Sequence, residues 1–136
     1  MPSSRTELSF NGPIEQACLD RTHDLLARLW QEQPEVAEVD QIMFTTAVLE
    51  VANNIVRHGG NGTVSVVLRG DEQQLEAYFC DDGAVVEVNL DTVVLPGDLA
   101  ESGRGFALVR MAVDELTYRH SDGNSRWHIV RRRLLS

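Results

Sequence analysis

The chain has 136 residues, with 12 positively charged and 21 acidic side chains and a formal net charge of −9. Every one of the 12 is an arginine, because the sequence contains no lysine. This excludes the Walker A phosphate loop, protein kinases of the eukaryotic type and Schiff-base enzymes, which all need a lysine amine. The acidic balance also argues against nucleic-acid binding, which depends on clustered positive charge. Because lysine is absent, any phosphate chemistry must use arginine, a metal ion or backbone N–H groups.

Length and composition indicate an ordinary globular protein with one domain, residues 1–136. Hydrophobic residues make up 43% of the chain and charged residues 24%, as in typical globular domains. No run approaches the ~20 apolar residues of a membrane span, and the N-terminal region has no apolar stretch of signal-peptide length. We therefore expect a cytoplasmic protein that binds neither membranes nor nucleic acid. Cys18 and Cys80 lie far apart in apolar surroundings, which predicts two buried thiols.

The first half of the chain predicts one strand and two helices. The run Thr6–Phe10 alternates weakly, as strands do, and Asn11–Pro13 is predicted to be a turn that opens a helix to about residue 33. A second helix is predicted from about Val39 to His58, because the stop signal Gly59-Gly60 follows it. Its apolar side chains recur at i, i+4, i+7 and i+11 and make one face: Phe44, Val48, Val51 and Ile55.

The second half predicts two pairs of strands separated by a long connection. Residues 84–102 contain short mixed apolar runs, and such a connection in a compact domain is often a functional lid. The elements predicted in chain order are the strands Thr63–Arg69 and Gln74–Cys80, a helix over Gly105–Leu116, and the strands Glu115–His120 and Arg126–Leu134.

This order of elements predicts an α+β fold. We expect a two-layer α/β sandwich, with a mixed, mostly antiparallel sheet and the helices on one face. The only basic run, Arg131–Arg133, alternates faces on what is expected to be an edge strand. There it would blunt strand pairing rather than bind phosphate.

The second predicted helix carries polar side chains that could do chemistry. Glu50, Asn54 and His58 are spaced i, i+4 and i+8, so they follow one another along one side of the helix. An amide oxygen binds Mg²⁺ without adding charge, and a carboxylate one turn away can deprotonate a nucleophile. The spacing alone favours a solvated polar face, with His58 meeting the helix dipole at the C-terminal end.

Two glycine-containing segments suggest a nucleotide site. Asp81-Asp82-Gly83 ends a predicted strand, where a carboxylate can accept a hydrogen bond from the adenine amine. Guanine presents an oxygen acceptor at the same position, and glycine lets a flat base approach. Gly103-Arg104-Gly105 opens a predicted helix, where backbone N–H groups and an arginine can hold phosphate. Taken singly, the first segment is also compatible with a surface turn and the second with a flexible linker.

Together and in this order, these segments resemble the GHKL ATPase superfamily, which includes gyrase and the histidine kinases and has the Bergerat ATP-binding fold. Within it the chain resembles the bacterial anti-sigma factor serine kinases. The resemblance extends from about residue 8 to residue 134. The matching segments are Glu50–Gly59 for the asparagine box, Asp81–Gly83 for the first glycine box, Glu101–Val109 for the second, and Asp122–Arg133 for the last hairpin.

This resemblance implies roles for the residues of the first two boxes. Asn54 would hold Mg²⁺ through its amide oxygen, and Glu50 would be the base that activates a serine hydroxyl or a water. Asp81 would read the adenine amine, with Gly83 beside the base. His58 matches a common residue of the family, although the resemblance gives it no chemical role.

For the phosphates and the last hairpin, the resemblance implies further contacts. Gly103, Arg104 and Gly105 would hold the phosphates under the lid. Ser125 stands where family members often carry a threonine near adenine, so a hydroxyl contact is expected there.

Two positions depart from the family pattern. Ala84-Val85 follows the first glycine box where a second glycine is usual, and Glu101 places a negative charge near the phosphates, where some kinases of the family carry a basic residue. ATP binding is therefore expected more firmly than phosphoryl transfer.

The resemblance implies an ATP-dependent serine protein kinase that uses Mg²⁺ and acts as an anti-sigma factor. It would bind a sigma factor and phosphorylate a serine of an anti-anti-sigma partner of the STAS type, and it would be a homodimer, as similar family members commonly are. Two alternatives stay open. One is a nucleotide-gated protein-binding module without kinase activity, and the other is an interaction domain that binds no nucleotide.

Overall fold

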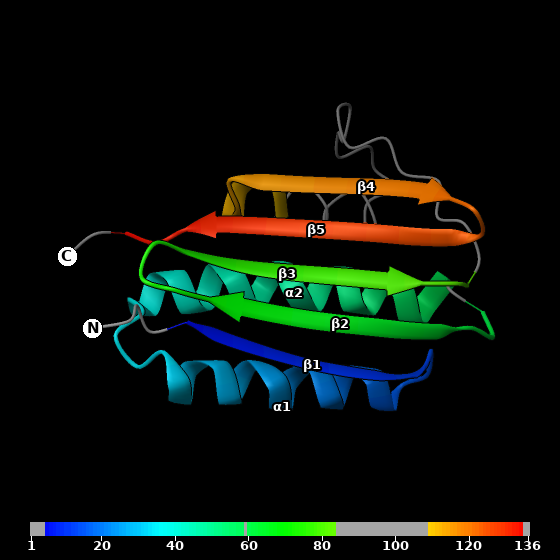
Figure 1. Ribbon diagram of the computed structural model, residues 1–136, viewed down its shortest axis with the longest axis horizontal. Coiled ribbons are helices and arrows are strands. Elements are labelled where there is room, and N and C mark those ends of the chain that lie inside the picture. Colours follow the sequence, from blue (N-terminus) through cyan, green and yellow to red (C-terminus); the bar gives the residue numbers. More distant parts are fainter. Residues whose placement is uncertain (1–4, 59, 84–108, 135–136) are drawn as a thin grey trace, which may run out of the picture.

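The computed structural model describes residues 5–58, 60–83 and 109–134. Its five strands form one sheet in the order β1-β2-β3-β5-β4, and every pairing is antiparallel (Figure 1). The predicted α+β class is confirmed. The elements are β1 (Thr6–Pro13), α1 (Ala17–Glu32), α2 (Glu38–His58), β2 (Thr63–Gly70), β3 (Gln74–Asp81), β4 (Glu115–Ser121) and β5 (Asn124–Arg132).

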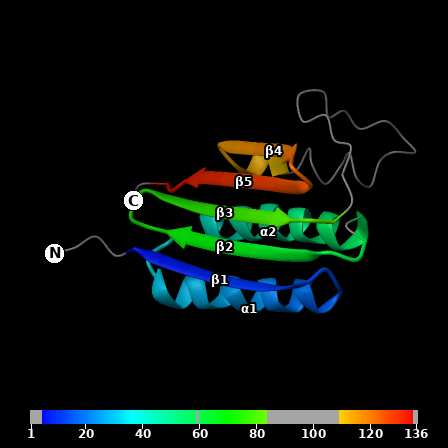
Figure 2. The same ribbon diagram turned by 45° about the vertical axis from the view of Figure 1, so that its right-hand side comes forward.

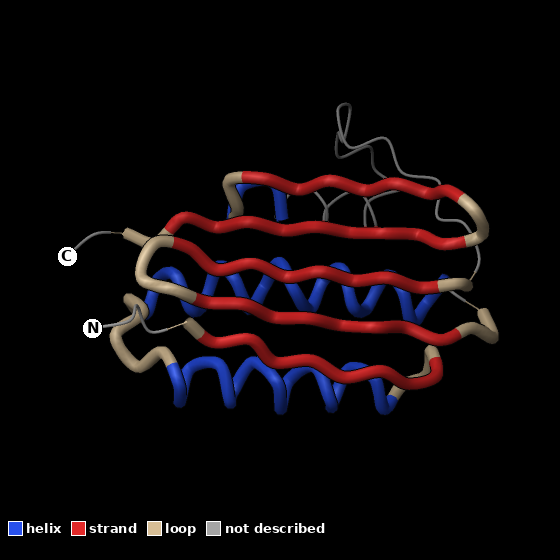
Figure 3. The backbone as a smooth tube through the Cα atoms, viewed as in Figure 1, coloured by secondary structure: helices blue, strands red, loops and turns tan. Residues whose placement is uncertain are grey.

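Helices α1 and α2 lie on one face of the sheet, and no described element covers the opposite face, which is called the open face below (Figure 3). Helix α1 contacts β1 and β2, while α2 contacts β3 and β5. The predicted apolar face of α2 is confirmed, since Phe44, Val48, Val51 and Ile55 are all at most 1% exposed. The core therefore lies between this layer of helices and the sheet, and the two-layer arrangement is confirmed.

Alternation along β3 decides which residues face the helices. Leu75, Ala77, Phe79 and Asp81 are buried, and the residues between them are half-buried on the open face. The thiol of Cys80 therefore lies on the open face, and the prediction that it is buried is wrong. Cys18 in α1 is buried as predicted, and burial raises the pKa of its thiol.

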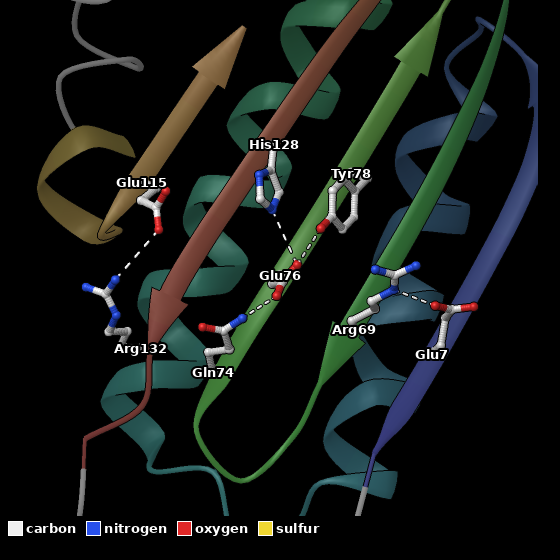
Figure 4. Close-up of polar contacts among 8 residues, drawn as sticks. All are labelled: Glu7, Arg69, Gln74, Glu76, Tyr78, Glu115, His128 and Arg132. Carbon is white, nitrogen blue, oxygen red and sulfur yellow. Dashed lines mark hydrogen bonds and ion pairs between the residues drawn. The ribbon is translucent and has the colours of Figure 1, made fainter.

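The open face carries a polar cluster around Glu76 (Figure 4). Its carboxylate accepts hydrogen bonds from the Tyr78 hydroxyl at 2.6 Å, from His128 Nε2 at 3.3 Å and from the amide of Gln74. The Tyr78 and His128 rings stack with their centroids 4.2 Å apart. Burial raises the pKa of Glu76, but the three hydrogen bonds outweigh burial and hold this pKa below its usual value. These hydrogen bonds link three residues of β3 to one another, and the bond from His128 joins them to β5.

The predicted turn at Asn11–Pro13 is wrong, because β1 continues through these residues. Asn11, Gly12 and Pro13 pair with Ser65, Val64 and Thr63 of β2. Proline is tolerated here because β1 is an edge strand and Pro13 is its last residue. Helix α1 consequently begins at Ala17, after a short connection.

Two expectations for the C-terminal part are also corrected. The third helix does not reach Leu116, because residues 115–121 pair with β5 as strand β4; within the described residues this helix covers 109–112. Strand β5 is not at the edge of the sheet, since β3 and β4 flank it. Arg131–Arg133 therefore does not blunt an exposed edge.

Arg131 instead forms a buried ion pair with Asp40 of α2. Its Nε lies 2.9 Å from Asp40 Oδ1, and the two side chains are 14% and 0% exposed. Arg131 Nη1 also donates to the carbonyl oxygen of Ala112 at 2.6 Å, and Asp40 Oδ2 accepts the N–H of Leu134 at 2.9 Å. One ion pair therefore joins the start of α2, the helix at 109–112 and the end of β5.

Replacing Asp40 with asparagine should lower the free energy of unfolding by about 3 kcal/mol. Breaking a buried pair from one side leaves an uncompensated charge, which costs roughly 3–5 kcal/mol. The matched control is Glu115→Gln, because Glu115 forms an exposed pair with Arg132 at 3.7 Å, for which ~0–1 kcal/mol is expected. Urea denaturation of both variants measures the difference. If Asp40→Asn and Glu115→Gln lose the same unfolding free energy, the buried pair of Asp40 contributes no more to stability than the exposed pair of Glu115.

Candidate functional site

Three segments with predicted site residues meet at one end of the molecule. The last turns of α2, the end of β3 and the start of β5 lie at this end in both views (Figures 1 and 2). Glu50, Asn54 and His58 belong to these turns of α2, Asp81 is the last residue of β3, and Ser125 is the second residue of β5. The fold therefore gathers residues from the asparagine box, the first glycine box and the last hairpin.

Asn54 is the most unusual polar residue at this end. Its side chain is buried, with 8% of the residue exposed, and its Oδ1 has no hydrogen-bond partner within the described residues. Buried polar atoms are normally hydrogen-bonded, and leaving one unsatisfied costs roughly 1–3 kcal/mol. A buried amide oxygen without a protein partner fits a residue that binds something supplied from outside the chain.

The donor set around Asn54 fits Mg²⁺ held together with phosphates. Amide and carboxylate oxygens suit this ion, which usually binds through one or two protein ligands plus substrate phosphates. Glu50 lies one helical turn before Asn54 and is half-buried, whereas His58 is exposed at the end of α2. Among residues 5–58, 60–83 and 109–134, no group of three or more acidic, histidine or cysteine side chains could hold a metal ion alone. The residues thus fit Mg²⁺ bound with a nucleotide.

Asp81 is a buried carboxylate facing the helices. It is 4% exposed, and its Oδ1 accepts the N–H of Gly83 at 3.1 Å. Burial raises the pKa of Asp81 above its ordinary value of 3.8; the Gly83 hydrogen bond opposes this rise, Asp82 adds to it and His120 opposes it. Its second oxygen, Oδ2, stands at the strand end where the adenine amine is expected.

The neighbouring Asp82 has a different, structural role. Its carboxylate accepts the backbone N–H of Thr63 at 2.6 Å and the Thr63 hydroxyl at 3.3 Å, which fixes the start of β2 beside the end of β3. Gly62 makes this approach possible, because a Cβ there would lie 2.9 Å from the nitrogen of Gly83. Gly62 was missed by the sequence analysis, since its importance depends on how β2 and β3 pair.

Ser125 lies directly opposite Asp81 in the pairing of β3 with β5. It is 1% exposed, and its Oγ lies 3.0 Å from His120 Nδ1 and 3.1 Å from the hydroxyl of Tyr118. His120 and Tyr118 belong to β4 and were also missed by the sequence analysis. Their alternate spacing in a predicted strand shows that they share a face, but only the register with β5 places them around Ser125.

The predicted phosphate-binding residues Gly103, Arg104 and Gly105 lie outside the described residues, as do Ala84-Val85 and Glu101. Their roles stay predictions.

A family model described as a histidine kinase-like ATPase domain matches residues 15–129. The chain belongs to this family. The superfamily predicted from the three boxes is thereby confirmed, and membership implies that this domain binds ATP. The match spans α1 to β5, so it includes every residue of the site described above. No curated protein matches the chain in sequence.

Solved structures of other proteins share this fold. The structure of the RsbU and RsbW domains of Rv1364c from Mycobacterium tuberculosis is 19% identical, with a TM-score of 0.64 over 94% of this chain and 32% of that one. The catalytic domain of histidine kinase ThkA is 9% identical, with a TM-score of 0.54 over 93% and 95% of the two chains. This chain therefore spans about a third of the Mycobacterium structure but nearly the whole ThkA domain.

A third similar structure is the histidine kinase domain of the blue-light activated histidine kinase EL346 from Erythrobacter litoralis. It is 16% identical, with a TM-score of 0.53 over 88% of this chain and 60% of that one. At these identities the likeness shows the fold. Neither α1 nor α2 has the length and hydropathy of a membrane-spanning helix, and the rest of the described chain contains no such helix.

Replacing Asn54 with leucine should stabilise the protein and remove its response to Mg²⁺. Removing the unsatisfied oxygen is expected to raise the free energy of unfolding by about 1–2 kcal/mol. Asn53→Leu is the matched control, since Asn53 is the half-buried neighbouring amide. Denaturation without nucleotide, and ATP titration with and without Mg²⁺, measure the two effects. An Asn54→Leu variant that keeps the full Mg²⁺ dependence would contradict the assignment.

Asp81→Asn should raise the free energy of unfolding at neutral pH while weakening ATP binding by about ten- to a hundredfold. Because the pKa of Asp81 is raised in the folded protein, its ionisation costs stability above that pKa and costs nothing below the ordinary value of 3.8. The gain in the free energy of unfolding should therefore vanish as the pH falls from above the raised pKa of Asp81 to below 3.8. Urea denaturation across pH and calorimetric titration with ATP test both parts.

The control for this experiment is Asp82→Asn, which should lose stability because the Asp82 carboxylate accepts two hydrogen bonds from Thr63. If Asp81→Asn is destabilised to the same degree, the burial cost assigned to Asp81 is incorrect.

Proposed function

We propose that this chain is an ATP-dependent serine protein kinase that acts as an anti-sigma factor. It binds Mg-ATP and a sigma factor, and it phosphorylates a serine of an anti-anti-sigma partner with a STAS domain. It works in the cytoplasm as a homodimer. The observation that carries the proposal is the buried oxygen of Asn54, which has no hydrogen-bond partner in the part of the chain that the structure describes, with the carboxylate of Glu50 one helical turn away.

The nucleotide would lie across the end of the sheet, between α2 and the last residues of β3. Asp81 would accept a hydrogen bond from the adenine amine, Gly83 would lie beside the base, and Asn54 would hold Mg²⁺. The bound ion would neutralise part of the negative charge of the phosphates. This division of roles is supported by the fold, because the last turns of α2, which carry Asn54, and the end of β3, which carries Asp81, lie at the same end of the molecule (Figures 1 and 2).

Glu50 would take the proton of the attacking serine hydroxyl. Phosphoryl transfer depends mainly on positioning and on stabilising charge, so one well-placed base and a set of N–H and guanidinium donors suffice. Gly103, Arg104 and Gly105 are the proposed donors to the phosphates. A pure nucleotide sensor needs no base, and the presence of Glu50 beside Asn54 therefore favours a kinase. The similarity in fold to two histidine kinases supports ATP as the phosphoryl donor.

A second candidate function is a nucleotide-gated binding module that performs no transfer. It is favoured by Glu101, whose negative charge would stand near the phosphates, and by Ala84-Val85 in place of the usual glycine. In this candidate, ATP changes the affinity for a protein partner by ordering part of the chain.

The test is transfer of labelled γ-phosphate from ATP to the purified anti-anti-sigma protein encoded nearby. Glu50→Gln should lower transfer roughly 10²–10⁴-fold, because it removes the general base, while the dissociation constant for ATP changes by less than about threefold. Glu38→Gln is the matched control, since Glu38 is an exposed glutamate at the start of the same helix.

If Glu50→Gln transfers phosphate at the wild-type rate, Glu50 is not the general base. Tight Mg-ATP binding without transfer to the partner would favour the binding module, and no ATP binding at all would refute both candidates.

A further inference from the structure

Strand β4 lies at one edge of the sheet, and its outer side is unpaired in the described part of the chain. Among residues 5–58, 60–83 and 109–134, only β5 pairs with it (Figure 1). The outer side of an edge strand presents N–H and C=O groups that can pair with another chain. The opposite edge strand, β1, ends with Gly12-Pro13, whereas β4 contains neither glycine nor proline. Strand β4 is therefore the edge better suited to pairing with a further strand.

The positive charge of β4 is not neutralised within the described residues. Arg119 lies directly opposite Arg126 of β5, and both side chains are exposed. Like charges that face each other across two strands are unfavourable, and the described part of the chain contains no ion pair of Arg119. Glu115 shares the open face with Arg119 but lies four residues away, about 13 Å along the strand. Arg119 would therefore be stabilised by a carboxylate supplied by another chain.

The charges of β4 complement one another when two copies of the strand run antiparallel with Thr117 at the centre. In this register Thr117 stands opposite Thr117 of the partner subunit, and Glu115 of each protomer stands opposite Arg119 of the other. Opposite charges and paired threonines both stabilise antiparallel strands. Sliding the strands by two residues places Arg119 opposite Thr117 or Val113, and Glu115 opposite Ser121 or Thr117. Only the register centred on Thr117 pairs both charges.

The side chains on the helix-covered face of β4 match in the same register. Leu116 of each protomer stands opposite Tyr118 of the other, and both are half-buried residues that pack against the core. An aromatic ring beside an aliphatic side chain is a favourable cross-strand pair. Asp114, which precedes β4, stands opposite His120. The Nδ1 atom of His120 lies 3.0 Å from Ser125 Oγ, so Nε2 is the nitrogen that faces an Asp114 carboxylate.

We propose that β4 pairs with β4 of a second copy of this chain, antiparallel and with Thr117 on the two-fold axis. The sheets of the two protomers then form one continuous sheet, with the helices of both on the same face. The inference rests on the proposed function, because it takes the homodimer stated there and names the surface that forms it. Since His120 contacts Ser125, each protomer also places Asp114 beside the candidate site of its partner.

The same charges limit which strand can pair with this edge. A strand without a carboxylate opposite Arg119 would bury this arginine beside Arg126 with no negative charge to compensate it. A contact between identical surfaces related by a two-fold axis is also complete with two subunits, so it does not continue into a filament. The edge is therefore suited to a dimer and not to open-ended assembly.

Charge reversal tests the proposed pairing. Sedimentation equilibrium of the whole chain at low salt measures the dissociation constant of the dimer. Arg119→Glu and Glu115→Arg should each weaken the dimer about tenfold or more, because each variant places two pairs of like charges across the axis. An equimolar mixture of the two variants should dimerise again, since every pair in the mixed dimer has opposite charges. Arg126→Glu is the matched control, with the same charge change one strand away from the edge, and should change the constant less than about threefold.

Cysteine cross-linking tests the register. In a Cys80→Ser background, Thr117→Cys should form a disulfide-linked dimer on mild oxidation, because directly opposed residues are within disulfide distance. Ser121→Cys is the control, since in this register the two Ser121 positions lie about 26 Å apart along the strands and should not cross-link.

A wild-type dimer that both Arg119→Glu and Glu115→Arg leave unchanged would overturn the inference, as would cross-linking through Ser121→Cys instead of Thr117→Cys. Either result leaves the homodimer of the proposed function in place. A wild-type chain that stays monomeric would refute that homodimer together with the inference. A dimer that responds as expected but transfers no phosphate would refute the proposed kinase and support the interface, so the two failures are distinguishable.

Discussion

The ion pair between Asp40 and Arg131 is the constraint on which the geometry of the site depends. It joins α2 to β5, and Arg131 also binds the last carbonyl of the helix at 109–112. Helix α2 carries Asn54, and β5 carries Ser125. Burying two charges costs several kcal/mol, which is offset only when the remaining hydrogen-bonding groups are satisfied. Here Leu134 and Ala112 complete the pair, and a shift of α2 along the sheet would break both contacts of Asp40, the one with Arg131 and the one with Leu134.

The other end of α2 shows the opposite behaviour, because polar groups there are buried without full satisfaction. Asn54 has an oxygen with no partner among the described residues, and the pKa of Asp81 is raised by burial. Both features lower the stability of the free protein. Proteins commonly break such rules at functional sites and compensate elsewhere in the fold. The rigid ion pair at one end and the unsatisfied groups at the other are therefore complementary features of the same helix.

Most of the fold and part of the site could be predicted from periodicity and short motifs. The apolar face of α2 and the alternation in β2 and β3 are local patterns, and they follow directly from the sequence. The turn predicted at Asn11–Pro13 was wrong because turn-forming residues also fit the end of an edge strand. Only the pairing with β2 distinguishes a turn from a strand here. The end of the third predicted helix was misplaced for the same reason, since pairing with β5 converts Leu116 to strand. Tyr118, His120 and Gly62 could not be found in advance, because their roles depend on strand register.

The antiparallel topology also has a consequence for how the protein folds. The hairpins β2–β3 and β4–β5 have short connections and can form from local contacts, whereas β3 and β5 pair only when residues 82–123 are closed into a loop. Closing a long loop costs entropy and slows folding. Asp81 and Ser125 meet at this late junction. The end of the sheet that carries Asp81 and Ser125 therefore forms only when the two hairpins join. Under the proposed function, a nucleotide bound at this end would stabilise the last contact of the sheet to form and not the first.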